Sequence, residues 1–407
     1  MGVRLDMRAN PGGEIDQNEV VGRDSFIDSF WGVLTHQSVL LLSERRFGKT
    51  TVIKKMKTEQ RADWLLLWRD VEGISTALEF AERVFRDIEE YLSKSKKFAS
   101  KTRAVLGSLG GIEIGGVFKL PPASKIPWKT LLEKSFEDLM EARQSRVVFF
   151  WDEIPFMIQK VHDNEGAPAA MEILDALRGI RQTHRHVRMV YCGSIGMHHV
   201  INALKKSGHT NPALNDLFTM PLPPLTSLHG AELARKLILG EALRCEDLDS
   251  TTTLLAAAVD CVPFYIHSVV KELAMRKAAV TPDEVNAVVD HSIVTAHDPW
   301  HLRHFEDRLA SYYGSDRELI AGALLDELAV ATQPLRLQDL QQSIASNSRL
   351  AAGTLGTAIQ SGDIKPLREL LEDLSQDHYI SQVAATGRYM FQFPLIKKWW
   401  AVRRGLL

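Results

Sequence analysis

Short, wholly apolar runs alternate with amphipathic stretches through the first half of the chain. A short apolar run with charged residues at its ends is typical of a strand buried on both faces of a sheet. The stretch after Ser75 and Thr76 instead has apolar residues at helical spacing, and either residue can cap a helix that runs to about Ser95. The pattern predicts an α/β core with strands at Ser38–Leu42, Trp64–Val71, Arg146–Ile154, Val187–Cys192 and Leu217–Leu222.

The second half of the chain is mainly helical in pattern. Prolines cluster between Asn211 and Thr226, where we expect the chain to leave the sheet. Helical spacing then continues from His229 to about His297. Asp298 and Pro299 predict a further helix start, with Asp298 as the N-cap and Pro299 in the first turn. In the first half, by contrast, a glycine-rich stretch at Gly107–Pro122 predicts an inserted β-hairpin.

The C-terminal part combines three predicted helices with a terminal pair of strands. We expect helices at Arg317–Val330, from Gln338 onwards and at Lys365–Ser375, and strands at His378–Val383 and Arg388–Phe393. A short extended piece around Leu335 separates the first two helices. This is the order of a winged-helix module, in which one helix can enter a DNA major groove while the wing contacts phosphates.

The charges of this module leave its partner open. Cations suited to DNA phosphates are Arg388, Lys397, Lys398, Arg403 and Arg404. Acids occupy the helix just before the wing, at Glu369, Glu372 and Asp373, and they favour contact with a protein instead. The formal net charge of −2 provides no electrostatic argument for nucleic acid over the whole chain.

Length and cysteine content narrow the class of protein. At 407 residues the chain exceeds a single ordinary core, so two or three domains are expected. The three cysteines have no paired spacing, which argues against a disulfide framework or a zinc site. No run approaches the roughly 20 apolar residues that a membrane span needs, so we expect no membrane partner and a reducing cytoplasm as the setting.

The loop after the first predicted strand carries the most specific chemistry. Gly48, Lys49 and Thr50 end a pattern in which backbone amides surround a β-phosphate at a helix N-terminus. Lys49 is expected to reach the β- and γ-phosphates, and the Thr50 hydroxyl to ligate Mg²⁺. Ser43 replaces the first glycine of the pattern, which weakens the match. A chance Gly-Lys-Thr at a helix start is the alternative interpretation.

A pair of carboxylates stands at the C-terminal end of the third predicted strand. Asp152 and Glu153 stand where open α/β sheets bind ligands, so Asp152 is a candidate Mg²⁺ ligand and Glu153 a candidate general base. An ordinary strand that ends in a solvated turn is the alternative. Ser194, after the fourth strand, is a candidate γ-phosphate sensor or a helix-capping serine. The arginines between these strands, Arg178, Arg181, Arg185 and Arg188, suit either an arginine finger or, more simply, a solvated helix face.

Taken together, Val21-Gly22-Arg23-Asp24, the phosphate loop, Asp152-Glu153 and Cys192-Gly193-Ser194 resemble the archaeal-type ATPase family. That family belongs to the STAND and AAA+ side of the P-loop NTPases and is related to Orc/Cdc6. The resemblance implies a three-layer P-loop core with a parallel sheet, a helical lid and a C-terminal winged helix. It also implies an adenine pocket near Val21 and Gly22 and a lid proline at Pro263. The family often has a glycine where this chain has Cys261.

The resemblance also implies a domain plan and a nucleotide site. We expect an N-terminal tail at 1–18, an ATPase core at 19–228, a lid at 229–297 and a winged-helix domain at 298–407. ATP and Mg²⁺ are the implied cofactors. The loop residues expected to line the nucleotide are Ser43, Glu44, Arg45, Arg46, Phe47, Gly48, Lys49, Thr50 and Thr51.

Three functions fit these features. The leading one is an ATP-hydrolysing switch whose nucleotide state controls engagement of double-stranded DNA or a partner protein, with nucleotide-dependent oligomers possible. The second is a non-hydrolysing adaptor in which ATP is structural. The third is a DNA-site-recognising protein, which predicts salt-sensitive DNA binding that substitutions at Lys397 and Lys398 weaken.

Overall fold

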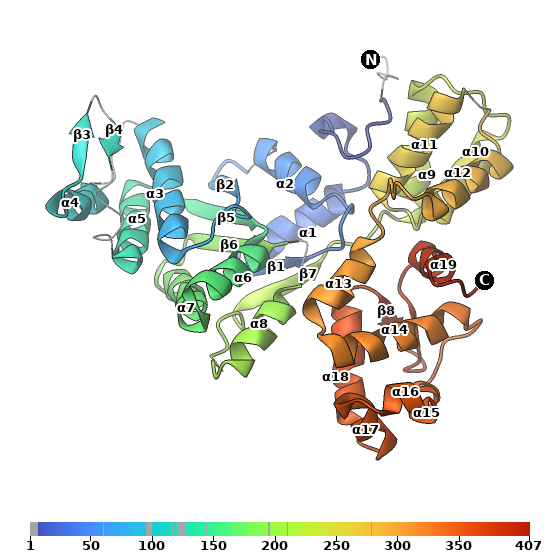
Figure 1. The fold of residues 1–407 in the computed structure, drawn as a ribbon. Helices are drawn as coiled ribbons and strands as arrows, with labels where there is room; N and C mark the ends of the chain where they lie inside the picture. Colours follow the sequence, from blue (N-terminus) through green and yellow to red (C-terminus); the bar gives the residue numbers. More distant parts are fainter. Residues whose placement is uncertain are drawn as a thin grey trace. The chain divides into compact units, whose positions relative to one another are not determined.

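The computed structural model describes residues 7–59, 61–94, 100–114, 117–119, 127–143, 145–193, 196–209, 211–277 and 279–407 (Figure 1). The chain divides into two compact units. The first, which we call the sheet unit, comprises Ser25–Ser43 and Val52–Leu222. The second, which we call the C-terminal unit, comprises Pro223–Leu407 together with the N-terminal residues up to Asp24 and the loop segment Glu44–Thr51.

A parallel sheet of five strands forms the centre of the sheet unit. Its order is β2-β5-β6-β1-β7, and each strand lies within a predicted run. The strands are β1 (Ser38–Leu42), β2 (Trp64–Asp70), β5 (Arg146–Asp152), β6 (Val187–Cys192) and β7 (Leu217–Pro221). The central strand β5 is buried from Val147 to Asp152, as expected for a strand covered on both faces.

Helices cover both faces of this sheet, and aromatic pairs identify which helix lies on which face. Phe30 of α1 (Asp24–Leu34) packs against Phe150 with ring centroids 5.8 Å apart. The neighbouring residue Trp151 points to the opposite face, because side chains alternate along a strand. There it packs against Phe80 of α3 (Ala77–Lys94), 5.2 Å away. The core therefore has the three layers that the sequence predicts.

The remaining elements of the sheet unit are six helices and a hairpin among the described residues. The helices are α2 (Lys49–Thr58), which follows the phosphate loop, α4 (Ser100–Ser108), α5 (Trp128–Ala142), α6 (Ile154–Glu165), α7 (Ala167–Thr183) and α8 (Met197–Lys206). The predicted inserted hairpin is present as the antiparallel pair β3 (Ile112–Ile114) and β4 (Val117–Lys119). The last residues of its predicted range, Pro121 and Pro122, lie outside the described residues.

Four helices form the first part of the C-terminal unit after Pro223. They are α9 (Ser227–Gly240), α10 (Leu248–Ala258), α11 (Pro263–Arg276) and α12 (Pro282–Val294). Thr226, Asp247 and Thr281 cap α9, α10 and α12, because each side chain accepts a hydrogen bond from an amide in the first turn. A short 3₁₀ helix, Gln17–Glu19, lies in the N-terminal segment.

The rest of the C-terminal unit contains seven further helices and one hairpin among the described residues. The helices are α13 (His304–Tyr312), α14 (Ser315–Val330), α15 (Leu337–Ser346), α16 (Ser348–Ala351), α17 (Thr354–Gln360), α18 (Lys365–Gln376) and α19 (Pro394–Arg403). Strands β8 (Ile380–Gln382) and β9 (Tyr389–Phe391) pair antiparallel. Leu335, in the predicted extended piece between α14 and α15, adds an antiparallel bridge to Tyr389.

The helix start predicted at Asp298 and Pro299 is wrong. Asp298 has a φ of 45°, which is a left-handed conformation, and α13 begins only at His304. The Asp298 carboxylate still accepts hydrogen bonds from backbone amides, at 2.8 Å from Leu302 and 3.0 Å from Arg303. The aspartate therefore organises the turn that leads into α13, several residues before the helix starts at His304.

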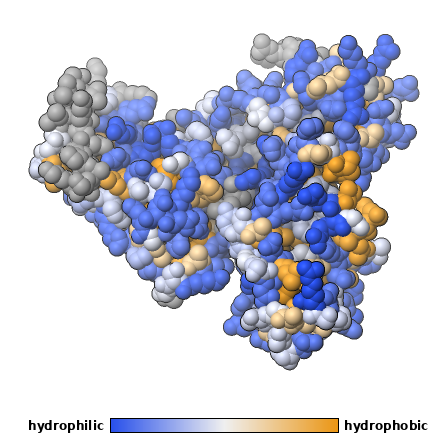
Figure 2. All heavy atoms as spheres, in the orientation of Figure 1, coloured by the Kyte–Doolittle hydropathy of each residue, from blue (hydrophilic) through white to orange (hydrophobic). Residues whose placement is uncertain are grey.

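The surface of the described residues is mainly polar. On the face drawn in Figure 2, hydrophilic residues predominate and hydrophobic ones occur in separate groups. Trp399 and Trp400 are buried, so they belong to the core. Among the described helices, none has the length and apolar character required to cross a bilayer.

Candidate functional site

The backbone of the phosphate loop has the features that the sequence pattern requires. β1 ends at Leu42 and α2 begins at Lys49, so the loop connects a strand directly to a helix N-terminus. Arg46 and Gly48 both have left-handed backbones, with φ of 73° and 90°. The first turn of α2 contains no acidic residue. A helix start without a competing carboxylate leaves its partial positive charge available to an anion.

Three side chains of the loop are held by other parts of the C-terminal unit. Glu44 is buried and accepts hydrogen bonds from Arg308 of α13. The Arg46 guanidinium lies 4.2 Å from the centre of the Phe264 ring. Phe47 packs edge-on against Phe393, with centroids 5.3 Å apart. The sequence pattern predicts that all loop residues line the nucleotide, and it does not reveal these long-range partners.

The Val21-Gly22-Arg23 segment also belongs to the C-terminal unit and contacts the loop. Val21 is buried, and Gly22 has a φ of 67°. A Cβ at Gly22 would lie 2.5 Å from the side chain of His229, so only glycine fits here. The buried Arg23 donates one hydrogen bond of 2.8 Å to the Phe47 carbonyl and another to Pro223. The adenine contacts predicted for Val21 and Gly22 stay predictions.

The carboxylate pair lies at the end of β5 in the sheet unit. Asp152 is buried, and its Oδ1 accepts hydrogen bonds from the Glu153 amide at 3.2 Å and from the Cys192 thiol at 3.3 Å. Glu153 has a left-handed backbone, with a φ of 58°, and serves as the N-cap residue of α6. Strained non-glycine conformations of this kind cluster at functional sites.

Gly193, at the end of β6, has a steric reason to be glycine. A Cβ there would lie 2.6 Å from Pro155 and 3.3 Å from the Glu153 carboxylate. The sequence assigns no role to Cys192 or Gly193 beyond the family pattern, whereas the structure places both beside the carboxylate pair. Ser194, the candidate sensor, lies outside the described residues.

The topology of the sheet brings the ends of the relevant strands to one edge. β1, β6 and β5 are neighbours and run parallel, so Ser43, Cys192 and Asp152 lie at or directly after their carboxyl ends. Open parallel sheets bind ligands at this edge. The loop residues from Glu44 onwards belong to the other unit. A joint grip of Lys49, Thr50 and Asp152 on one Mg²⁺-triphosphate stays a prediction.

The lid proline starts a helix, as expected from the resemblance. Pro263 is the first residue of α11. The two residues before its N-cap, Asp260 and Cys261, have left-handed backbones, with φ of 52° and 55°. Glycine adopts this conformation without strain, so the backbone at Cys261 would also accept a glycine. The contact of Pro263 with nucleotide stays a prediction.

Arg181 is neither an arginine finger nor part of a solvated face. Its side chain is only 3% exposed and forms two hydrogen bonds of 2.8 Å with Asp216. It also donates to the Tyr191 hydroxyl at 2.6 Å. Arg188 donates to the backbone carbonyls of Leu34 and Thr35. Helical spacing alone does not reveal this burial.

Two solved structures resemble the whole chain. A Walker-type ATPase of Pyrococcus abyssi is 12% identical and superimposes with a TM-score of 0.60, covering 97% of this chain and 99% of its own. The ORC2 protein of Aeropyrum pernix, solved as complexes with ADPNP and ADP, is 11% identical with a TM-score of 0.52, and 98% of each chain is covered. This chain has the fold of these two proteins. No protein-family model and no curated protein sequence matches it.

The predicted P-loop NTPase fold with a parallel sheet is therefore confirmed, whereas the lid and the winged helix stay predictions. The likeness extends over nearly the full length of each chain, so it includes the helical part after Pro223 as well as the sheet. At 11–12% identity it shows the P-loop ATPase fold and not the chemistry of individual residues. The predicted domain boundaries stay predictions.

Proposed function

We propose that the protein is an ATP-hydrolysing switch. The observation that carries this proposal is the local structure after β1, where a loop with left-handed residues at Arg46 and Gly48 leads into a helix that starts with Lys49. A buried aspartate and a strained glutamate follow β5, at the sheet edge where β1 also ends. This combination suits binding and cleavage of a triphosphate. The helix start can bind the phosphates, and the two carboxylates can bind a cation and accept a proton.

The donor set fits a nucleotide with Mg²⁺. Lys49 and the amides at the start of α2 would hold the phosphates, while the Thr50 hydroxyl and the Asp152 carboxylate offer the oxygen ligands that Mg²⁺ prefers. When bound, Mg²⁺ neutralises charge on the β- and γ-phosphates. The chain's own contribution is to orient the triphosphate and to place the Glu153 carboxylate where it can accept a proton from the attacking water.

Glu153→Gln tests this assignment. The substitution keeps the shape of the side chain but removes the basic oxygen, so we expect ATP binding to persist while turnover falls by at least about 100-fold. Steady-state phosphate release and equilibrium binding of a fluorescent ATP analogue measure the two properties separately.

A matched control is Glu72→Gln, because Glu72 is exposed and follows β2 at the same edge of the sheet. Its turnover should stay within about twofold of the unmodified protein. Turnover that survives in Glu153→Gln would contradict the assigned base. If the unmodified protein binds ATP without any turnover, with and without DNA, the adaptor function replaces the switch.

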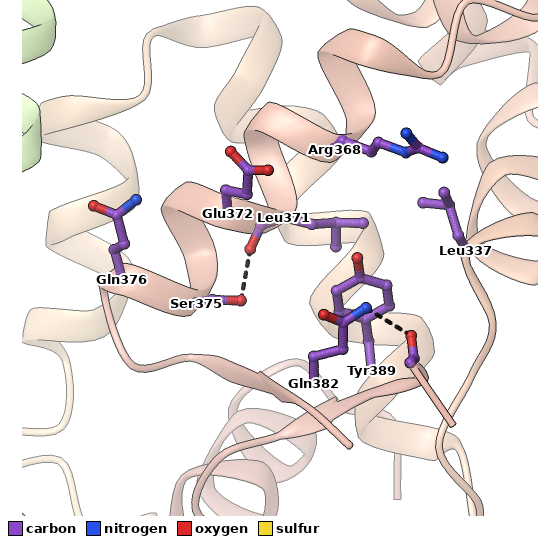
Figure 3. A pocket seen from close by; sticks show the side chains of 9 residues that line it. Leu337, Arg368, Leu371, Glu372, Ser375, Gln376, Gln382 and Tyr389 are labelled. Carbon is purple, nitrogen blue, oxygen red and sulfur yellow. Dashed lines mark hydrogen bonds between the residues drawn. The ribbon is translucent and has the colours of Figure 1, made fainter. Parts of the chain in front are cut away.

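We further propose that the part from α14 to α19 is a winged helix. Its support is the element order, in which Leu335, between the first two helices, pairs with Tyr389 of the terminal hairpin. A groove of about 650 Å³ lies between α18 and this hairpin (Figure 3). Leu337 and Leu371 line it together with the polar side chains of Arg368, Glu372 and Tyr389.

The charges around the groove favour a protein partner over DNA. The tail cations predicted to be available are all engaged: Lys397 donates to the Ala331 carbonyl, Lys398 pairs with Asp290, Arg403 with Glu306 and Arg404 with Asp326. The exposed face of α18 presents Glu369 and Glu372, which repel phosphate.

Fluorescence anisotropy with a duplex DNA probe tests the choice of partner. We expect that the protein does not show salt-sensitive DNA binding, which would be binding at 50 mM salt that is lost at 200 mM salt. Salt-sensitive binding that Arg368→Ala weakens would instead assign the groove face to DNA. Size-exclusion chromatography of the same samples, with and without ATP, tests the expected nucleotide-dependent oligomer.

A further inference from the structure

The carboxylate of Glu44 is held by a buried set of donors far away in the sequence. Arg308 Nη2 lies 2.9 Å from Glu44 Oε1, and Nη1 lies 3.0 Å from Oε2, so the guanidinium binds both oxygens. His304, one turn earlier on α13, places Nε2 3.1 Å from Oε1. The Arg45 amide also donates to Oε1, at 2.7 Å. We call Glu44, His304 and Arg308 the loop clamp.

The clamp is anchored in turn by the segment after α18. Arg308 Nη1 donates a hydrogen bond of 2.7 Å to the Asp377 carbonyl, and the Tyr313 hydroxyl donates to the Asp377 carboxylate at 2.6 Å. The Tyr379 hydroxyl donates to the Phe305 carbonyl on the same helix as Arg308. The guanidinium is therefore held by the segment after α18 as well as by the loop.

Electrostatics keep the Glu44 carboxylate of the clamp ionised. Burial by itself would raise the pKa of Glu44, but the Arg308 charge and the hydrogen bond to His304 outweigh burial and hold the pKa well below its usual range. A buried ion pair of this kind is seldom the most stabilising choice, because desolvation offsets most of the attraction. Its best-attested use is to specify one arrangement of the chain.

We propose that Arg308 and His304 are positioning residues of the nucleotide site, which act by fixing the phosphate loop through Glu44. This inference rests on the proposed ATP-binding function. Glu44 follows directly after Ser43 and precedes Lys49 within the same loop, so a shift of its side chain moves the backbone that must surround the phosphates. Arg23 and Phe393 support the same loop at Phe47.

Nucleotide binding and formation of the loop clamp should influence each other equally. If the clamp improves phosphate binding, bound nucleotide must stabilise the clamp by the same free energy. The helix α13 packs on α14, the first helix of the module that we propose as a winged helix. Nucleotide occupancy is thereby connected to that module through named side chains.

A set of four variants tests the clamp: Arg308→Met, Arg308→Lys, Glu44→Gln and the double variant Glu44→Gln/Arg308→Met. We expect Arg308→Met to weaken binding of the fluorescent ATP analogue by about tenfold or more. Arg308→Lys should recover part of the loss, because an ammonium still pairs with Glu44 but cannot bind both oxygens in the same planar geometry. Thermal unfolding without nucleotide is measured in parallel.

The double variant separates positioning from simple stability. It removes the buried charge that Arg308→Met leaves unpaired, so its unfolding temperature should exceed that of Arg308→Met. Its nucleotide affinity should stay low, because the clamp is still absent. Should the single variant fail to fold, the double variant and Glu44→Gln carry the same comparison.

Arg181→Met is the matched control, since Arg181 is equally buried and binds Asp216 in the sheet unit. It should lose stability and keep its ATP affinity within about twofold. The inference is overturned if all folded clamp variants bind the analogue within twofold of the unmodified protein, or if affinity follows unfolding temperature across the set. If the unmodified protein binds no nucleotide, the proposed function itself fails, which is a distinct result.

Discussion

Two buried arginines, one in each unit, form similar contacts over very different lengths of chain. Arg181 and Arg308 each bind both oxygens of a carboxylate and donate to further oxygens, two for Arg181 and one for Arg308. Their side chains are 3% and 6% exposed. The partner of Arg181 is Asp216, 35 residues away, whereas the partner of Arg308 is Glu44, 264 residues away.

The two arginines differ in where their partners lie, and this difference indicates different roles. Arg181 ties helix α7 to Ala213 and Asp216 before β7, and it also donates to the Tyr191 hydroxyl of β6. All of these groups belong to the sheet unit, so the pair holds that unit together. The Glu44 pair instead includes a residue of the phosphate loop. A buried arginine–carboxylate pair therefore stabilises the fold in the sheet unit and, as we propose, supports ligand binding in the C-terminal unit.

The largest effect expected from this comparison is a loss of stability without a loss of function. Arg181→Met should lower the free energy of unfolding by about 3 kcal/mol, because it leaves the Asp216 carboxylate without its cation. Urea unfolding measures the loss, and the KM for ATP should be unchanged. A clear rise in KM would show that the two arginines do not divide their roles as described.

A second expected effect is on the pH dependence of stability. One carboxyl group in each unit contributes to it, and the two contributions have opposite signs. Burial raises the pKa of Asp260 in the C-terminal unit to about 6, although the Leu395 amide donates to its carboxylate. The folded state thus prefers protonated Asp260, and its contribution is fully present below the unfolded pKa of about 3.9 and lost as the pH rises through 6. Asp260→Asn should therefore raise stability at pH 8 by on the order of 2 kcal/mol.

Asp216 provides the counterpart in the sheet unit. Burial alone would raise its pKa, but the hydrogen bonds and charge of Arg181 hold that pKa below its ordinary value. Its contribution is present above the unfolded pKa and is lost as the pH falls through the folded pKa. Urea unfolding between pH 3 and pH 8 should show the stability gap of Asp216→Asn narrowing in acid, while Asp260→Asn gains most at pH 8. Equal pH profiles for both variants would contradict this assignment.

The smallest expected effect compares two buried tyrosines. The Tyr191 hydroxyl accepts a hydrogen bond from the charged Arg181, and the Tyr379 hydroxyl donates one to the neutral Phe305 carbonyl. Hydrogen bonds to charged groups contribute more, so Tyr191→Phe should cost about 2 kcal/mol and Tyr379→Phe about 1 kcal/mol. Unfolding in urea measures both, and the reverse order would show that Arg181 finds another acceptor.

The sequence is most informative where local pattern and long-range structure agree. The bounds of β1 follow from the apolar run Ser38–Leu42, and β5 lies within its predicted run, because a strand buried on both faces must be apolar throughout. The phosphate loop is recognisable because its chemistry depends on adjacent residues. The turn at Asp298 escapes the pattern, since an aspartate before a proline looks like a helix cap whether the helix follows at once or a turn later.

The contacts of the candidate site are harder to predict. Nothing in the spacing of Arg178, Arg181, Arg185 and Arg188 indicates which of them is buried. Glu44 does carry a usable signal, because an acid within a phosphate-binding loop requires a nearby cation to offset its repulsion. Periodicity cannot identify that cation as Arg308, because the pairing depends on how distant helices pack.

The distance between Glu44 and Arg308 along the chain also has a consequence for biosynthesis. A ribosome that adds roughly 5–20 residues per second produces the arginine about 13–50 s after the glutamate. All five strands of the sheet unit have been made before the interval ends, so they can pair while the guanidinium that completes the loop is still missing. The phosphate loop is thus among the last parts of the nascent protein to mature, although it is encoded near the beginning.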